Sequence, residues 1–119
     1  MIDVLIADPD PAVRKALALL LSHRLGVVTI REAGDTEALI CALEEFPPAL
    51  LLLDWRMYGA PAPQTSRLLQ KAYPGLKVVL LSVDKDDAQV AHETEAAFIH
   101  KGASPADIIA VLGPLLGKS

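Results

Sequence analysis

The sequence is poor in several features that mark particular classes of protein. It has one cysteine, Cys41, so it cannot form an internal disulfide bond, which suits a reducing compartment. The helical spacing of Cys41 among apolar residues predicts that it packs in the core. Aromatic residues make up 4% of the chain, so the core must be mainly aliphatic. No apolar stretch approaches the roughly 20 residues that span a bilayer, and the N-terminus lacks the pattern of a signal peptide.

The chain also lacks a basic patch. Its formal net charge is −4 and its pI is near 5.2, so direct nucleic-acid binding is not expected. Hydrophobic residues make up 52% and charged residues 22%, which is enough to build a core and excludes a disordered chain. A length of 119 residues fits one domain. We therefore expect a single cytoplasmic domain over residues 1–119, with no membrane partner.

Short apolar runs alternate with helical patterns along the whole chain. The runs cover residues 2–7, 27–31, 49–53, 77–81 and 97–100. Asp10-Pro11 and a capping box at Ser104 mark two helix N-termini, whereas Gly113-Pro114 predicts an early break or kink in the last helix. Five strands that alternate with five helices predict an α/β fold with a parallel sheet covered on both faces. The expected architecture is the doubly wound, flavodoxin-like order 2-1-3-4-5.

Polar side chains stand where four of these strands end. Asp8, Asp54, Ser82 and Lys101 each come directly after an apolar run. In an open parallel sheet, ligands bind at the carboxyl ends of the strands, beside the point where the strand order reverses. Strands 1 and 3 are neighbours in the expected order. Asp8 and Asp54 should therefore face each other, with Ser82 and Lys101 beside them.

This set of residue types suits phosphoryl transfer. Two close carboxylates repel each other, and a divalent cation removes that conflict; oxygen ligands with retained waters favour Mg²⁺. The metal also screens the approach of an anionic phosphoryl group to Asp54, the candidate nucleophile. Lys101 and Ser82 can each bind a phosphoryl oxygen, by charge and by hydrogen bond respectively. Transfer between phosphate donors needs little beyond positioning and charge neutralisation.

Four stretches, in order and at nearly regular spacing, carry a family resemblance. They are residues 4–8 (VLIAD), 51–57 (LLLDWRM), 79–82 (VLLS) and 98–104 (FIHKGAS). On these stretches the chain resembles, over its whole length, the receiver domain of a response regulator in two-component signal transduction. The resemblance implies a five-stranded receiver fold and a phosphorelay role. It also implies no enzymic activity beyond Mg²⁺-dependent self-phosphorylation and self-dephosphorylation.

The same resemblance assigns roles to individual residues. Asp54 would be the phosphoacceptor, taking a phosphoryl group from a sensor histidine kinase or a phosphotransfer protein. Lys101 and Ser82 would bind the phosphate, Ser82 would also be the switch hydroxyl, and Phe98 would occupy the aromatic switch position. A C-terminal effector domain in the native gene and a homodimer are the further partners that the family suggests.

The metal site departs from the family pattern. The resemblance assigns Mg²⁺ to Asp8, Asp54 and the backbone carbonyl of Arg56. The family usually has two acidic residues after the first strand, and Pro9 stands at the second position. Loss of this ligand should weaken the metal by at least the roughly 10–100-fold that outer-shell losses cost. Asp10 is an alternative ligand, although the proline that follows it favours a role as a helix cap.

Other departures keep two alternatives open. Tyr58 replaces a usual proline, Val83 replaces a small residue, and the chain is about three residues short in the fourth helical segment, with no glycine before the last strand. Pro9, Val83 and the short fourth helical segment favour a pseudo-receiver, a protein-interaction module that works without phosphorylation. The Asp8-Pro-Asp10 stretch also resembles the nucleophile motif of haloacid-dehalogenase-type phosphatases. However, no acidic pair follows Lys101, and the chain is too short for that core and its cap.

Overall fold

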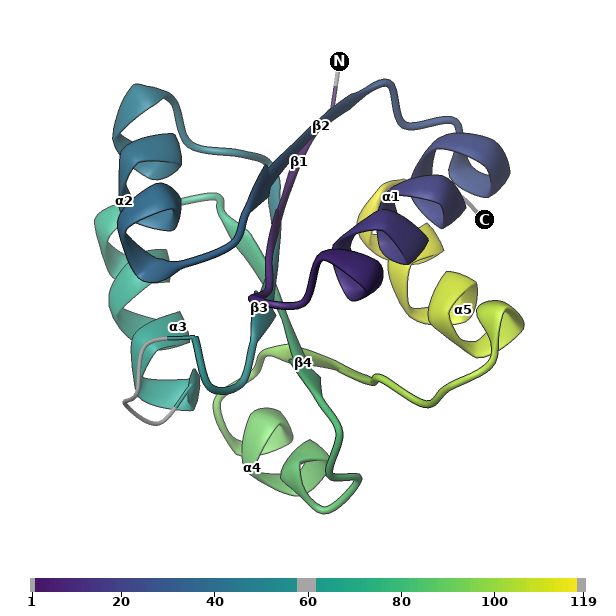
Figure 1. Cartoon of the computed structure of the whole chain (residues 1–119). Helices are drawn as coiled ribbons and strands as arrows, with labels where there is room; N and C mark the ends of the chain where they lie inside the picture. The colour runs from purple at the N-terminus through teal and green to yellow at the C-terminus, as the bar shows by residue number, and fades with distance from the viewer. Residues whose placement is uncertain (1, 58–61, 118–119) are drawn as a thin grey trace.

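The computed structural model describes residues 2–57 and 62–117, so Tyr58 lies outside the described residues. Strands and helices alternate throughout (Figure 1). The elements, in chain order, are β1 (Asp3–Ala7), α1 (Pro11–Leu25), β2 (Thr29–Ala33), α2 (Thr36–Glu45), β3 (Leu50–Asp54), α3 (Ala62–Ala72), β4 (Lys77–Ser82), α4 (Asp87–Glu93), β5 (Ala97–His100) and α5 (Pro105–Leu115). Among the described residues, no helix is long and apolar enough to cross a membrane.

The five strands form one parallel sheet in the order β2-β1-β3-β4-β5, which confirms the predicted doubly wound fold. Helices α1 and α5 cover one face, and α2, α3 and α4 cover the other (Figure 1). Alternate residues of a strand point to opposite faces, so β1 sends Val4 and Ile6 to the first layer and Leu5 and Ala7 to the second. Because both faces are covered, the central strands are apolar at nearly every position.

Strand β2 begins two residues later than the sequence pattern predicted. The residues before it complete the end of α1 instead. Gly26 adopts the left-handed conformation, with φ at 69°, and its N–H donates to the Leu21 carbonyl. Val27 donates to the same carbonyl at 2.9 Å. This cap removes residues 27 and 28 from the strand, which runs from Thr29 to Ala33.

The predicted early break at Gly113-Pro114 was wrong. Helix α5 continues through both residues and ends at Leu115. A proline removes only its own N–H bond to the preceding turn, and here it lies in the last turn, where the helix is about to end. Buried Leu112 and Leu116 anchor this turn, and the Leu116 N–H donates to the carbonyls of Leu112 and Gly113, both at 3.1 Å.

The prediction that Cys41 packs in the core was also wrong, because its side chain is exposed. Helix α2 buries Leu39 and Leu43, which are four residues apart and therefore share a face. Cys41 lies midway between them in sequence and so points away from that face. The helical spacing was correct, but it did not identify the buried side.

The turn between α4 and β5 contains an unusual backbone conformation. Glu95 has φ at 61° and is the one residue other than glycine with positive φ among those described. A side chain in this region costs roughly 1–2 kcal/mol relative to the right-handed conformation. Helix α4 before it has seven residues, about two turns, as the short fourth segment predicted. Together these features compress the connection between β4 and β5.

Candidate functional site

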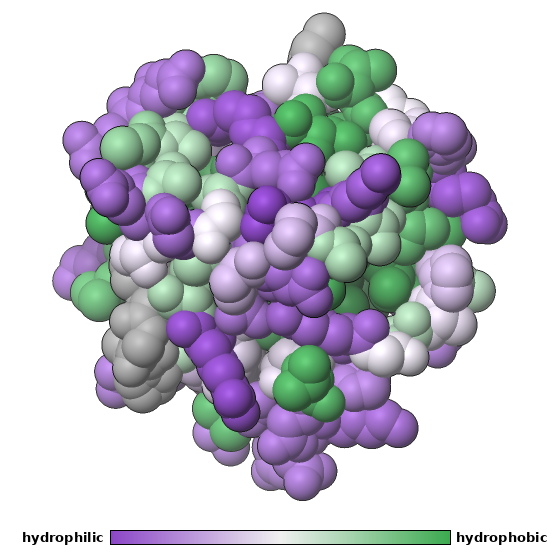
Figure 2. All heavy atoms as spheres, viewed as in Figure 1, coloured by the Kyte–Doolittle hydropathy of each residue, from purple (hydrophilic) through white to green (hydrophobic). Residues whose placement is uncertain are grey.

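Strand register brings the predicted residues to one edge of the sheet. Ala7 of β1 lies opposite Leu53 of β3, so the next residues, Asp8 and Asp54, are neighbours. The Lys101 N–H donates to the Ser82 carbonyl at 2.8 Å, which joins the ends of β4 and β5. Figure 2 shows hydrophilic residues across the middle of the viewed face, and apolar residues most frequent to the right of them, where Figure 1 places α1 and α5.

Lys101 bridges the two aspartates. Its Nζ lies 2.6 Å from Asp8 Oδ2 and 2.6 Å from Asp54 Oδ1. Asp8 is fully buried, Asp54 is 6% exposed, and the Lys101 side chain is 16% exposed. One positive charge therefore stands against two negative charges in a largely desolvated site, where charge interactions are stronger than in water. The site retains a formal charge of about −1, which a further cation would balance.

In each aspartate, one carboxylate oxygen accepts a backbone N–H and the other faces Lys101. Asp8 Oδ1 accepts the Asp10 N–H at 2.8 Å, and Asp54 Oδ2 accepts the Arg56 N–H at 3.0 Å. These turn hydrogen bonds fix both carboxylates and leave one oxygen of each directed at Lys101. Asp8 Oδ2 has no well-aligned hydrogen bond despite its short distance to Lys101 Nζ. The ion pair is the interaction that matters here, because charge attraction depends far less on angle than a hydrogen bond does.

The same contacts perturb the lysine. Burial is the largest single influence and opposes the charged form of Lys101. Hydrogen bonds and charges from Asp54 and Asp8 together outweigh it and raise the Lys101 pKa above 10.5. The ammonium therefore stays protonated at any physiological pH and can act as a fixed positive charge.

The donor set fits a divalent cation, although with few protein ligands. Asp8 Oδ2 and Asp54 Oδ1, which both contact Lys101 Nζ, are hard oxygen donors of the kind that Mg²⁺ prefers. Asp10 does not join them, because its carboxylate caps α1 by accepting the Ala12 N–H at 2.9 Å. Within residues 2–57 and 62–117, no group of three or more His, Cys, Asp or Glu side chains could hold a metal. The described residues bring two carboxylates together here, and the Arg56 carbonyl stays a predicted ligand.

Ser82 and Phe98 lie next to this cluster but are engaged elsewhere. The Ser82 hydroxyl donates to Asp87 Oδ2 of α4 at 2.6 Å. Phe98 of β5 is half-buried and meets Trp55 edge to face, with ring centroids 6.2 Å apart. Trp55 follows Asp54 directly, so this ring pair connects the phosphoacceptor candidate to the position expected for the aromatic switch.

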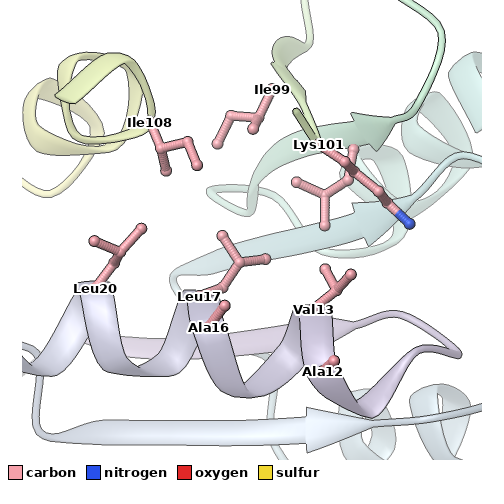
Figure 3. Close-up of a pocket in the computed structure, with 9 residues that line it drawn as sticks. Ala12, Val13, Ala16, Leu17, Leu20, Ile99, Lys101 and Ile108 are labelled. Atoms are coloured by element: carbon pink, nitrogen blue, oxygen red, sulfur yellow. The ribbon is translucent and has the colours of Figure 1, made fainter. Parts of the chain in front are cut away.

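The stem of Lys101 lines an apolar pocket of about 230 Å³ between α1 and α5. Figure 3 shows side chains from both helices around this space, with the Lys101 nitrogen directed away from Leu20 and Ile108. Long charged side chains commonly pack their methylene groups against apolar surface while the charged end reaches a polar one. The pocket therefore helps to direct the ammonium toward the aspartates.

Sequence reasoning missed three residues that support the site. Arg14 of α1 donates from Nη1 to the Asp8 carbonyl at 2.7 Å, and Thr36 Oγ1 of α2 donates to the Met57 carbonyl at 2.7 Å. The third is Asp87, the acceptor for Ser82. Thr36 contacts an atom 21 residues away, whereas Arg14 and Asp87 contact atoms six and five residues away. Only the helical position of Arg14, one turn after the predicted N-cap, gave a usable signal.

The comparisons with known proteins agree with this geometry. Residues 4–113 match the family described as the response regulator receiver domain. The chain belongs to this family. It is a receiver domain of the two-component response-regulator type, and not a member of a classical enzyme family. The match also places the chain in a different family from the dehalogenase-type phosphatases.

Two similar curated proteins are regulators from Pseudomonas. The chain is 29% identical over 109 residues to transcriptional activator protein ExaE of Pseudomonas putida, covering 89% of this chain and 51% of that protein. It is 27% identical over 112 residues to response regulator GacA of Pseudomonas viridiflava, covering 92% and 52%. The chain thus spans about half the length of the curated relatives that it matches.

Solved receiver structures share the fold. The receiver domain of NtrX from Brucella abortus has a TM-score of 0.81 at 26% identity, covering 98% of this chain and 100% of that one. The isolated receiver domain of RcsB from Salmonella enterica serovar Typhimurium, in the presence of the phosphomimetic BeF₃⁻, has a TM-score of 0.83 at 22% identity. It covers 99% of this chain and 91% of that one.

Proposed function

We propose that this receiver domain is a phosphoacceptor, with Asp54 as the residue that is phosphorylated. The observation that carries the proposal is the convergence of Asp8 Oδ2 and Asp54 Oδ1 on Lys101 Nζ, each at 2.6 Å. This arrangement combines a nucleophilic oxygen, a fixed positive charge and a second carboxylate suited to a cation. Phosphoryl transfer requires these groups and little other chemistry.

In the proposed reaction, an Asp54 carboxylate oxygen attacks the phosphorus of a phosphohistidine. The new O–P bond forms as the P–N bond breaks, and the electron pair of that bond goes to the imidazole nitrogen, which is then protonated. Lys101 neutralises negative charge on the transferring phosphoryl oxygens, because its ammonium already lies within 2.6 Å of the Asp54 oxygen. Ser82 would donate a hydrogen bond to a second phosphoryl oxygen.

Receiver domains of this family typically bind Mg²⁺. Asp8, Asp54 and the Arg56 carbonyl would hold it here, and the metal would supply charge neutralisation next to the phosphoryl group. With Pro9 in place of an acidic residue and Asp10 capping α1, two carboxylates are the charged ligands we assign. We expect a dissociation constant for Mg²⁺ at least about tenfold higher than that of a site with three carboxylates.

The phosphoryl donor in this proposal is a sensor histidine kinase or phosphotransfer protein. Residues 1–119 would form the receiver unit, and an effector domain would follow in the native protein. The length of the curated relatives supports this part of the proposal, since the chain covers about half of each. We place the protein in the cytoplasm, where kinases of this kind and their ATP are found. Formation of a homodimer is a separate prediction.

Beryllofluoride, a mimic of the phosphoryl group, tests the function without a kinase. Trp55 adjoins Asp54 and contacts Phe98, so its fluorescence should report binding. With Mg²⁺ present, we expect a saturable change in wild-type fluorescence and none in Asp54→Asn. A response that persists in Asp54→Asn would assign the ligand to another site.

The pseudo-receiver is the second candidate, and a specific observation favours it: the Asp10 carboxylate is engaged by the Ala12 N–H. A phosphorylation-independent module would show no wild-type response to beryllofluoride even at tens of millimolar Mg²⁺. Its affinity for a protein partner would also be unchanged by Asp54→Asn. A fluorescence response that requires Asp54 excludes this candidate.

A further inference from the structure

A further acidic side chain, that of Asp87 in α4, contacts the carboxyl edge of the sheet. Ser82 Oγ donates to Asp87 Oδ2 at 2.6 Å and accepts the Asp84 N–H at 3.0 Å. Ser82 is 4% exposed, and Asp87 is half-buried. A hydroxyl has one proton to donate, so the donor capacity of Ser82 is fully used by Asp87.

We propose that Asp87 is a positioning residue that competes with the phosphoryl group for the Ser82 hydroxyl. The inference rests on the proposed phosphorylation of Asp54 and adds the contact that must break first. Ser82 cannot donate its single proton to Asp87 and to a phosphoryl oxygen at once. On phosphorylation, Ser82 would lose its charge-assisted hydrogen bond to Asp87 and gain one to a phosphoryl oxygen. The bond to Asp87 therefore opposes phosphorylation.

The position of Asp87 connects this exchange to α4. Asp87 lies in the first turn of that helix, and the preceding Asp86 makes no side-chain capping bond. The hydrogen bond to Ser82 is thus a direct side-chain link from the start of α4 to the end of β4. When Ser82 turns to the phosphoryl group, this link is lost. The seven residues of α4 bury one side chain fully, that of Ala91, so little else holds the helix in place.

Two alanine substitutions in adjacent acidic residues separate this role from general charge. Asp87→Ala removes the acceptor of the Ser82 hydrogen bond. Asp86→Ala is the matched control, because it removes an equal charge from the neighbouring residue, whose exposed side chain makes no capping bond. With Mg²⁺ present and Trp55 fluorescence as the readout, we expect Asp87→Ala to bind beryllofluoride roughly fivefold more tightly than wild type. Asp86→Ala should stay within about twofold of wild type, because surface charge effects are small.

The double variant Ser82→Ala/Asp87→Ala tests whether the effect passes through Ser82. Its affinity should equal that of Ser82→Ala alone, because without the hydroxyl there is no proton to compete for. Asp87→Asn, which keeps the shape of the side chain and removes its charge, should give an intermediate increase in affinity. This variant also preserves the test if Asp87→Ala does not fold.

The outcomes that overturn the inference differ from those that overturn the function. An affinity of Asp87→Ala and Asp87→Asn equal to or weaker than that of wild type overturns the competition by Asp87, while the Asp54-dependent response of the wild type still stands. An equal gain in Asp86→Ala also overturns it, because charge alone then explains the gain. If the wild type shows no response that depends on Asp54, the proposed function fails and the inference fails with it.

Discussion

At each end of strand β1 an aspartate pairs with a partly buried cation, but the two cations are held differently. At the carboxyl end, the Lys101 ammonium pairs with the side chains of Asp8 and Asp54. At the amino end, Arg31 pairs with Asp3 at 2.7 Å. We infer that the partners of Lys101 can change when a ligand binds, whereas those of Arg31 are fixed.

The arginine cluster is fixed by backbone contacts. Arg31 donates to the carbonyls of Ala42 at 2.9 Å and Phe46 at 2.8 Å, at the end of α2. Its guanidinium also lies 4.1 Å from the centroid of the Phe46 ring. The planar group thus joins β1, β2 and α2 through several directional contacts at once. Replacing any one partner leaves the others in place, which is what a structural clamp requires.

The lysine cluster has the opposite character. An ammonium is a point charge on a flexible stem, and its two partners are side chains whose remaining oxygens are already fixed by turn hydrogen bonds. In the proposed function, a divalent cation or a phosphoryl group would therefore contact side-chain atoms and not backbone groups. We infer that the same charge pairing supports stability at one edge of the sheet and chemistry at the other.

The largest expected effects come from removing each cation. Lys101→Met and Arg31→Met should each lower the free energy of unfolding by about 3 kcal/mol, because each leaves a buried carboxylate unpaired. Mg²⁺ at about five times its dissociation constant should restore about 1 kcal/mol to Lys101→Met, where two carboxylates converge. It should restore nothing to Arg31→Met. Urea unfolding with and without Mg²⁺ measures both, and equal recovery in the two variants would remove the distinction between the clusters.

The pH dependence of stability sharpens the same comparison. The Lys101 pKa is raised above 10.5 in the folded state, so the folded protein holds this proton more tightly than the unfolded chain. The stabilisation is fully present below pH 10.5 and is lost as pH rises through the folded pKa. The difference in unfolding free energy between wild type and Lys101→Met should therefore be constant from pH 8 to 10 and shrink above it. The difference for Arg31→Met should stay constant, because arginine remains charged.

A substitution in the turn before β5, at the opposite edge of the sheet from Lys101, should raise stability without changing ligand binding. Glu95 occupies a left-handed conformation in the turn before β5, and Gly75 occupies the same region before β4, with φ at 95°. Glu95→Gly should raise the free energy of unfolding by about 0.5–1 kcal/mol, since glycine enters this region without strain. Thermal unfolding measures the gain, and beryllofluoride affinity should not change. A loss of stability would show that the Glu95 side chain contributes more than its backbone costs.

The sheet and the lysine cluster at its carboxyl edge were predictable from the sequence, whereas the arginine cluster was not. Continuous apolar strands predicted the parallel sheet, and the polar residues at their ends, Asp8, Asp54 and Lys101, predicted the site that the structure assembles. Local signals also worked where the interaction is local, as in the cap by Asp10. These predictions depend on the spacing of apolar residues and on the residue types at strand ends and helix caps, which can be read from short segments.

The remainder depends on contacts between distant segments. Nothing in the local sequence shows that Arg31 reaches the end of α2, or that Thr36 donates to the Met57 carbonyl. The course of α5 beyond Pro114 was missed because burial of Leu112 and Leu116 outweighs one absent hydrogen bond. In such cases tertiary packing overrides local propensity, and short sequence patterns do not reveal that packing.

Intact mass after incubation with acetyl phosphate and Mg²⁺ is the most direct test of the central claim. The account predicts that wild type gains the mass of one phosphoryl group and that Asp54→Asn gains none under the same conditions. An unmodified wild type at saturating Mg²⁺, or equal modification of Asp54→Asn, would contradict it.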